Sequence, residues 1–236
     1  MEKCVPVVVE HGILRSGNPA RIVEKLAAAD HKLQAFGWWN AEEGVLGATP
    51  ESLFSLEANK LRTMALAGTA RREEREVFCV DDKEIREHEF VAQNLISKLS
   101  DLGMVRRQDR RMLDLGKLVH FQTLIEVELY RPEKIDELVA RLHPTPALGP
   151  LPRTADTMHL ATDWRDRLAC PATFGAPFGL LHEGIFHSLV AIRMVSWKGR
   201  EVFLPSGCGI IEESRLVNEW RELRLKRDAV KETLEI

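Results

Sequence analysis

The sequence lacks the features that mark several common classes of protein. Its 33 basic residues do not outnumber its 36 acidic residues, and the net charge of −3 excludes the strongly basic surface typical of a nucleic-acid-binding protein. No run of apolar residues approaches the roughly 18 needed for a transmembrane helix. The four cysteines show neither a CxxC spacing nor a disulfide framework. We therefore expect neither nucleic acid nor a membrane as a partner.

Motifs for nucleotide binding and hydrolysis are absent as well. The chain contains no GxxxxGK[ST] loop and no GxGxxG fingerprint. It also contains no GxSxG nucleophile motif and no HExxH zinc motif. A hydrolase therefore has no support from the motifs.

What the chain does contain is an ordinary globular composition. Apolar residues make up 44% and charged residues 29% of its 236 residues, enough to build a sizeable core. We expect one domain over residues 1–236. The first residues include the acidic Glu2 and are soon followed by Pro6, both of which a signal peptide avoids. Reduced cysteines and this beginning predict a cytoplasmic protein.

The hydrophobic pattern alternates between short strands and amphipathic helices. Asn18 is a natural cap for the first helix and Ser214 for the last. Strands are predicted at 5–9, 33–39, 45–46, 52–56, 61–66, 119–129, 185–197 and 201–204, and helices at 19–29, 82–102, 132–142, 154–168 and 214–233. Hairpins interspersed with helices indicate an α+β fold.

Two of the predicted helices carry carboxylates on one face. Glu219, Glu222 and Lys226 share a face of the last helix, and Glu84 and Glu87 share a face of the long middle helix. Two such helices could hold a hard cation such as Mg²⁺, which binds oxygen ligands. From spacing alone, however, solvated faces with ion pairs are the favoured interpretation.

Two further features are ambiguous on their own. The stretch Gly207-Cys208-Gly209 before a helix could bind an anion, although a strand edge that needs glycine is the simpler explanation. His120 lies inside an apolar strand and is by default a core histidine. Taken singly, these features indicate only an α+β protein with clustered carboxylates.

The order of the motifs along the chain is more informative than any one of them. They are Gly47-Ala48-Thr49-Pro50-Glu51, Ala65-Leu66-Ala67-Gly68-Thr69, Lys83 with Glu87-His88, His120, His143-Pro144-Thr145-Pro146-Ala147-Leu148, Ile192-Arg193, Gly207-Cys208-Gly209-Ile210, and Glu219-Trp220-Arg221-Glu222 with Lys226. In this order they resemble the chorismate-utilising enzymes: isochorismate synthase, anthranilate synthase component I, aminodeoxychorismate synthase component I and salicylate synthase. The resemblance implies their fold, antiparallel sheets flanked by helices.

Within that family, the loop around Pro144 and Pro146 resembles the isochorismate synthase version. Aminodeoxychorismate synthases tend to have a lysine nucleophile where this chain has Ala67, which cannot form a covalent adduct. The resemblance therefore implies an isochorismate synthase that converts chorismate to isochorismate with Mg²⁺. Menaquinone biosynthesis is the expected pathway, with a siderophore or salicylate as the other destinations.

The resemblance also implies roles for individual residues. Lys3 matches the general base that activates water for attack at C2 of chorismate, and Glu51 matches the acid that protonates the departing C4 hydroxyl. Glu87 and Glu222, together with Glu219, match metal-ligand positions. The residues that would contact the substrate are Gly68, Thr69, His120, Ala147, Leu148, Arg193, Gly207, Cys208, Gly209 and Lys226.

Some positions depart from the family pattern. Lys3 is the third residue, whereas family members have further strands before this lysine, so we expect an N-terminally short version of the fold. Val127, Leu180 and the pair Leu223-Arg224 replace residues usual in the family; each could alter substrate choice or weaken activity, but none removes a matched acid or metal ligand. The alternatives to isochorismate synthase are a salicylate synthase that continues to salicylate and pyruvate, and a truncated homologue without activity.

Overall fold

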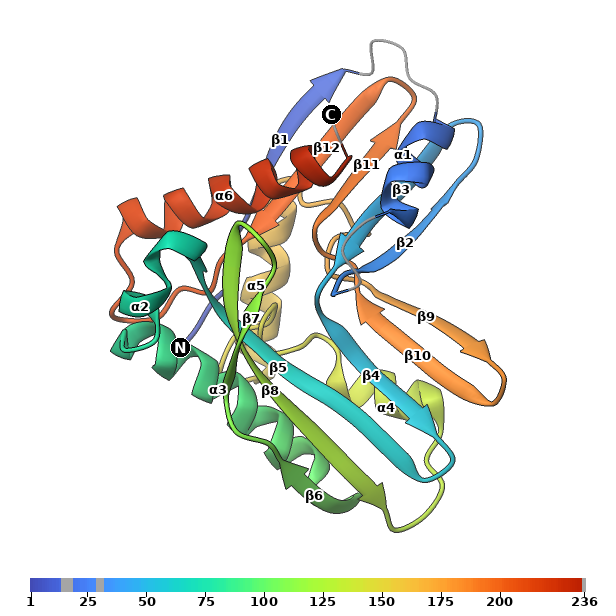
Figure 1. Ribbon diagram of the computed structural model, residues 1–236, viewed down its shortest axis with the longest axis vertical. Helices are drawn as coiled ribbons and strands as arrows, with labels where there is room; N and C mark the ends of the chain where they lie inside the picture. The colour runs from blue at the N-terminus through green and yellow to red at the C-terminus, as the bar shows by residue number, and fades with distance from the viewer. Residues whose placement is uncertain (14–18, 29–31, 235–236) are drawn as a thin grey trace.

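A computed structural model describes residues 1–13, 19–28 and 32–234. It contains two antiparallel sheets, and the chain passes directly from strands of one sheet into strands of the other (Figure 1). The first sheet has the order β1 (Val7–Ile13), β12 (Glu201–Gly207), β11 (Met194–Lys198), β3 (Glu43–Thr49) and β2 (Gln34–Trp39). The second has the order β6 (Gly103–Arg107), β8 (Leu118–Leu129), β5 (Lys60–Arg71), β4 (Ser52–Glu57), β10 (Ile185–Val190) and β9 (Pro177–His182), with β7 (Arg111–Asp114) also pairing with β8.

Helices cover the two sheets separately. Helices α1 (Pro19–Ala27) and α6 (Leu216–Leu234) pack on the first sheet, where Val230 and Leu234 meet Leu46 and Leu204. Helices α3 (Asp82–Leu99) and α4 (Ile135–Leu142) pack on the second sheet, and their buried apolar side chains form one core with those of its strands. The remaining helices are α2 (Arg75–Phe78), preceded by a 3₁₀ turn at Arg72–Glu74, and α5 (Ala155–Arg167). This arrangement confirms the predicted α+β class.

The chain passes from one sheet to the other at two neighbouring points. Strand β3 leads through Pro50 and Glu51 into β4, and β10 leads through Ala191–Arg193 into β11. Because β3 pairs with β11 and β4 pairs with β10, both crossings lie at the same junction between the sheets. This junction positions the functional residues described below.

The strand predicted at 185–197 is wrong as a single element. It is broken at Arg193, whose φ of 52° lies in the left-handed region, because the chain must leave one sheet and enter the other. The prediction also missed β6, β7 and β9. It ended helix α3 about three residues too late and began helix α4 about three residues too early.

The two helix caps have different outcomes. The predicted cap at Ser214 is wrong, because α6 begins at Leu216 and the Ser214 hydroxyl instead accepts a hydrogen bond from the Ile211 N–H in the preceding turn. The predicted cap at Asn18 lies outside the described residues.

All four cysteines are free thiols, as expected. Among the helices of the described part of the chain, none has the length and apolar character required to cross a bilayer.

Candidate active site

A cavity lies at the junction of the two sheets, with an empty volume of about 680 Å³ that includes solvent at its mouth. Most of the residues that the sequence singles out line it, although they come from distant parts of the chain. These lining residues are Glu51, Gly68, Thr69, Glu87, His120, Ala147, Leu148, Arg193, Gly207, Gly209, Glu222 and Lys226. Lys3, Cys208 and Glu219 are buried beside the cavity rather than in its lining.

Glu51 is a buried acid at the crossing between β3 and β4. The Thr145 hydroxyl donates a hydrogen bond of 2.9 Å to its Oε1 atom, and only 4% of the residue is exposed. Burial raises the pKa of Glu51 to about 7, although the Thr145 hydrogen bond and the charges of Lys3, Arg193 and Lys226 act in the opposite direction. Glu51 can therefore be protonated near neutral pH.

Lys3 is fixed even though it is close to the chain terminus. Its backbone forms a bridge with Leu151, with the Leu151 N–H donating to the Lys3 carbonyl at 3.0 Å, and Cys4 forms a second bridge with Ile210. The side chain of Lys3 is fully buried, and its Nζ atom lies 3.2 Å from Glu87 Oε1. Two loops therefore hold the terminal segment against the site.

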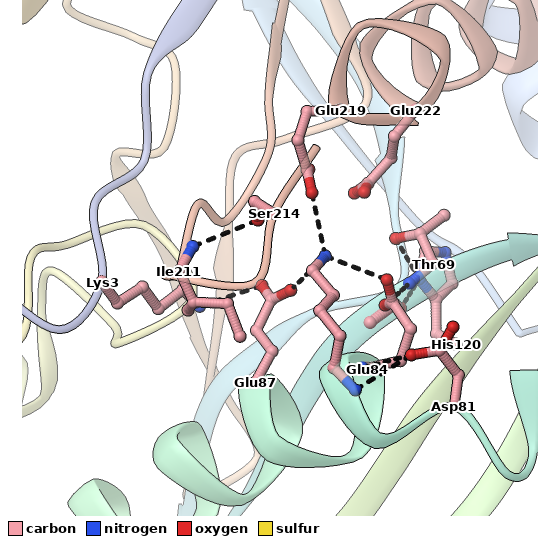
Figure 2. A network of polar contacts seen from close by, with 12 residues as sticks. Lys3, Thr69, Asp81, Glu84, Glu87, His120, Ile211, Ser214, Glu219 and Glu222 are labelled. Atoms are coloured by element: carbon pink, nitrogen blue, oxygen red, sulfur yellow. Dashed lines mark hydrogen bonds and ion pairs between the residues drawn. The ribbon is translucent and has the colours of Figure 1, made fainter. Parts of the chain in front are cut away.

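Four carboxylates converge from two helices beside the cavity. Figure 2 shows Glu84 and Glu87 on α3 pointing toward Glu219 and Glu222 on α6. Glu87 and Glu222 both line the cavity, one from each helix. Glu84 shares a helix face with Glu87 and, although it is not among the expected metal ligands, its carboxylate belongs to this group.

A lysine occupies the space between these carboxylates. Lys83 Nζ lies 2.9 Å from Glu84 Oε1, 3.2 Å from Glu87 Oε2 and 3.1 Å from Glu219 Oε1. Burial lowers the pKa of Lys83, but the surrounding carboxylates outweigh this effect and raise it above the usual value. Sequence spacing gave no sign of this position, because it depends on how α6 packs against the start of α3.

The donor set suits a hard divalent cation. All four side chains offer carboxylate oxygens, the ligands that Mg²⁺ prefers. One of these oxygens, Glu219 Oε2, is buried and finds no hydrogen-bond partner among the described residues. Throughout the described ranges, no three acidic, histidine or cysteine side chains are arranged as a ready-made metal site. The chemistry of the residues therefore fits a cation, while Lys83 holds the central place.

His120 is both a satisfied buried histidine and a lining residue. Its Nδ1 lies 2.9 Å from the Gly68 carbonyl, and its Nε2 lies 3.2 Å from the Arg193 guanidinium. Because arginine can only donate, Nε2 accepts and Nδ1 carries the proton. Burial lowers the pKa of His120 well below its usual value, so the ring is neutral. His120 is therefore a hydrogen-bonded core histidine and also part of the cavity lining.

The basic side chains of the cavity are held by the backbone and by carboxylates. Lys226 Nζ donates to the Gly207 carbonyl at 2.8 Å and lies 2.5 Å from Glu222 Oε1. Arg193 extends from the crossing between β10 and β11, and burial lowers its pKa to about 10. Together they place positive charge where an anionic ligand could bind.

Gly209 allows Glu87 and Lys3 to approach the backbone. A Cβ atom at this position would lie 1.9 Å from Glu87 Oε1 and 2.8 Å from Lys3 Cε. We predict that Gly209→Ala displaces both side chains and lowers activity by about tenfold or more, because small misplacements of catalytic groups are costly. Steady-state kinetics on the variant check this. Gly12→Ala on β1 is the control, since a Cβ there makes only an ordinary 3.9 Å contact, and equal losses in both variants would contradict the prediction.

The four side chains Val127, Leu180, Leu223 and Arg224, which depart from the family pattern, do not line the cavity. Val127 is 1% exposed within the core under α3, and Leu180 is 65% exposed on β9. Leu223 is buried, while Arg224 points outward and pairs with Asp228 at 3.8 Å. His88, the neighbour of Glu87 in the sequence, does not line the cavity either: it is buried, and its Nε2 atom lies 2.9 Å from the Thr123 hydroxyl.

Comparison with known proteins agrees with this geometry. A family model described as "Chorismate binding enzyme" matches residues 9–235, and the chain belongs to this family. It is 30% identical over 228 residues to the salicylate biosynthesis isochorismate synthase of Pseudomonas aeruginosa, covering 92% of this chain and 47% of that protein. It is also 30% identical over 218 residues to isochorismate synthase EntC of Escherichia coli, covering 87% of this chain and 55% of that one.

Solved structures show the same fold. The menaquinone-specific isochorismate synthase MenF of Escherichia coli superposes with a TM-score of 0.80 at 23% identity, covering 99% of this chain and 57% of that one. A putative 2,3-dihydroxybenzoate-specific isochorismate synthase, DhbC of Bacillus anthracis, gives a TM-score of 0.87 at 21% identity, covering 99% and 67%. The chain spans about half the length of the curated relatives it matches.

Proposed function

We propose that this chain converts chorismate to isochorismate in a Mg²⁺-dependent reaction. The observation that carries the proposal is the buried Glu51, with a pKa of about 7, facing a cavity whose other polar lining includes basic residues and the carboxylates Glu87 and Glu222. Support comes from its relatives in the family, which include isochorismate synthases. The reaction adds water at C2 of chorismate and expels the hydroxyl at C4, so it needs one base and one acid.

Glu51 is the proposed acid. Because the Thr145 hydroxyl donates to Oε1, the proton of the neutral carboxyl is left on Oε2, which can pass it to the departing hydroxyl. A pKa of about 7 leaves much of Glu51 protonated at neutral pH and still permits the transfer. Thr145 therefore orients the acid, a role that its place in the sequence motif does not reveal.

Lys3 is the proposed base. Its ammonium is paired with Glu87 at 3.2 Å, and it must give up its proton before it can activate water. A cation bound by Glu87 would occupy that carboxylate and release Lys3 from the pair. The base and the cation site are therefore linked through one side chain.

The remaining residues bind and orient the substrate. Chorismate carries two carboxylates, and we assign their recognition to Arg193, Lys226 and the backbone of Gly207–Gly209. Gly68, Thr69, Ala147 and Leu148 would line the ring. A Mg²⁺ ion held by Glu87 and Glu222, with Glu84 and Glu219 beside them, would neutralise the acidic wall and attract a substrate carboxylate. We also propose that the protein acts in the cytoplasm and in menaquinone biosynthesis. The relatives' names point to salicylate, menaquinone and 2,3-dihydroxybenzoate and do not select one.

The test is a product assay on the purified chain. Incubated with chorismate and Mg²⁺, it is expected to form isochorismate, and EDTA should reduce the rate at least about 100-fold if the cation is essential. Chromatography against standards measures the product. Salicylate with pyruvate would reassign the chain to the alternative lyase reaction. No turnover by a protein with a folded circular-dichroism spectrum would favour the inactive homologue.

A further inference from the structure

Lys83 has a place in this site that catalysis by Lys3 and Glu51 does not explain. Its side chain is 15% exposed, and its ammonium contacts Glu84, Glu87 and Glu219 within 3.2 Å. These three carboxylates come from two helices that are far apart in the sequence. Lys83 is therefore the cation that joins α3 and α6 at the site.

Formal charges show why such a cation is needed. Without Lys83, the ammonium groups of the described residues that contact the carboxylates Glu84, Glu87, Glu219 and Glu222 would be those of Lys3 and Lys226. Lys3 contacts Glu87, and Lys226 contacts Glu222. Glu84 and Glu219 would then have no ammonium in contact with them. Water cannot replace it at Glu219, because only 4% of that residue is exposed. Uncompensated buried charge is strongly unfavourable.

The same position is where a divalent cation would have to bind. Mg²⁺ needs oxygen ligands at about 2.0–2.1 Å. A carboxylate oxygen that already accepts a hydrogen bond from an ammonium is a weaker ligand for Mg²⁺, and the positive charge of the ammonium repels the metal ion. Lys83 contacts one oxygen each of Glu84, Glu87 and Glu219. The lysine and the metal ion therefore compete for the same carboxylates.

We propose that Lys83 is a built-in counter-ion that a divalent cation must displace, so that this residue sets the cation affinity of the enzyme. The proposal rests on the proposed cation site at these carboxylates. It makes Lys83 a positioning residue: it keeps the carboxylates together before the metal ion binds, and it weakens binding of that ion.

Three of the four carboxylates, Glu84, Glu219 and Glu222, can be reached without passing through the substrate cavity. A second cavity lies on the other side of Thr69 and Glu222 and is lined also by Glu84, Glu219, Asp81 and Glu74. Cation exchange can therefore be measured on the protein alone, with no chorismate present.

The experiment is isothermal titration calorimetry of Mg²⁺ into the substrate-free chain. Lys83→Met is expected to bind Mg²⁺ at least about tenfold more tightly than the parent, a difference of about 1.4 kcal/mol. Lys134→Met, at the residue that precedes α4, is the matched control, because it removes one positive charge from an exposed lysine outside the site. It should bind Mg²⁺ like the parent. Equal or weaker binding by Lys83→Met overturns the proposal.

Thermal unfolding gives an independent measure that does not need turnover. Without metal, Lys83→Met should melt at a lower temperature than the parent, and saturating Mg²⁺ should raise its melting temperature by more than it raises the parent's. If Lys83→Met fails to fold, Lys83→Gln, which keeps a neutral donor of similar length, takes its place with the same expectation. A parent and variants that all fail to bind Mg²⁺ would overturn both the cation site and the role of Lys83. A parent that binds Mg²⁺ and forms isochorismate, with variants that bind no tighter, would overturn the role of Lys83 alone.

Discussion

Glu51→Gln is expected to reduce kcat by about 10²–10⁴-fold, the range that general acid catalysis contributes. Glutamine matches the shape of glutamate and can accept the Thr145 hydrogen bond, but it cannot supply the proton for the departing hydroxyl. KM for chorismate should change little. Steady-state kinetics measure both quantities, and Glu57→Gln, an exposed carboxyl at the end of β4, is the control.

The same residue predicts the direction of the pH dependence. The acid must be protonated, so kcat should fall as pH rises through about 7, the pKa of buried Glu51. Its folded pKa lies above the usual value, so the protonated form stabilises the fold at low pH and this contribution is lost as pH rises through about 7. Glu51→Gln should therefore be more stable than the parent at pH 8, by on the order of 3 kcal/mol. A variant with normal turnover, or one less stable at pH 8, would rule out this role.

Glu87→Gln is expected to lose both activity and stability. Burial acts to raise the pKa of Glu87, but the charges of Lys3, Lys83 and Lys226 outweigh it and lower the pKa, so the carboxylate is ionised at neutral pH. Replacing it leaves buried Lys3 without its partner, at a cost of about 3–5 kcal/mol. We expect at least about 100-fold lower turnover and weaker Mg²⁺ binding, because a proposed ligand is removed.

Urea unfolding at two pH values checks the stability part of this prediction. A lowered pKa stabilises the fold above the usual pKa and loses that effect as pH falls through the folded value. The difference between parent and Glu87→Gln should therefore be large at pH 7 and smaller near pH 4. Glu89→Gln, on the same helix but paired with Arg107 near the surface, should cost only about 1 kcal/mol or less. Similar losses in the two variants would contradict the assignment of Glu87.

The sequence predicted those parts of the site that depend on local periodicity. Glu84 with Glu87, and Glu219 with Glu222, are three residues apart, so a helix must place each pair on one face. The order of motifs added Glu51, His120 and Arg193, which no spacing rule connects. The α+β class followed from the alternation of short strands and helices. That residues 1–236 form a single domain stays a prediction.

Other features could not be read from local patterns because they depend on tertiary packing. The run at 185–197 is continuously strand-like, and only the meeting of two sheets explains why it breaks at Arg193. Lys83 follows Asp82 in what looks like an ordinary charged first turn, and its role depends on Glu219, which is 136 positions further along the chain. Thr145 was part of a recognised motif, but its hydrogen bond to Glu51 spans two separate elements.

The most direct test of the proposed chemistry is to run the reaction in ¹⁸O-labelled water and determine the mass of the product at early times. If Lys3 activates water for attack at C2, isochorismate formed by the parent chain should carry one ¹⁸O atom, and Lys3→Met should form almost none of this product while still binding chorismate. Unlabelled isochorismate would show that the C4 hydroxyl is transferred without water. Labelled product formed at the parental rate by Lys3→Met would show that another group is the base.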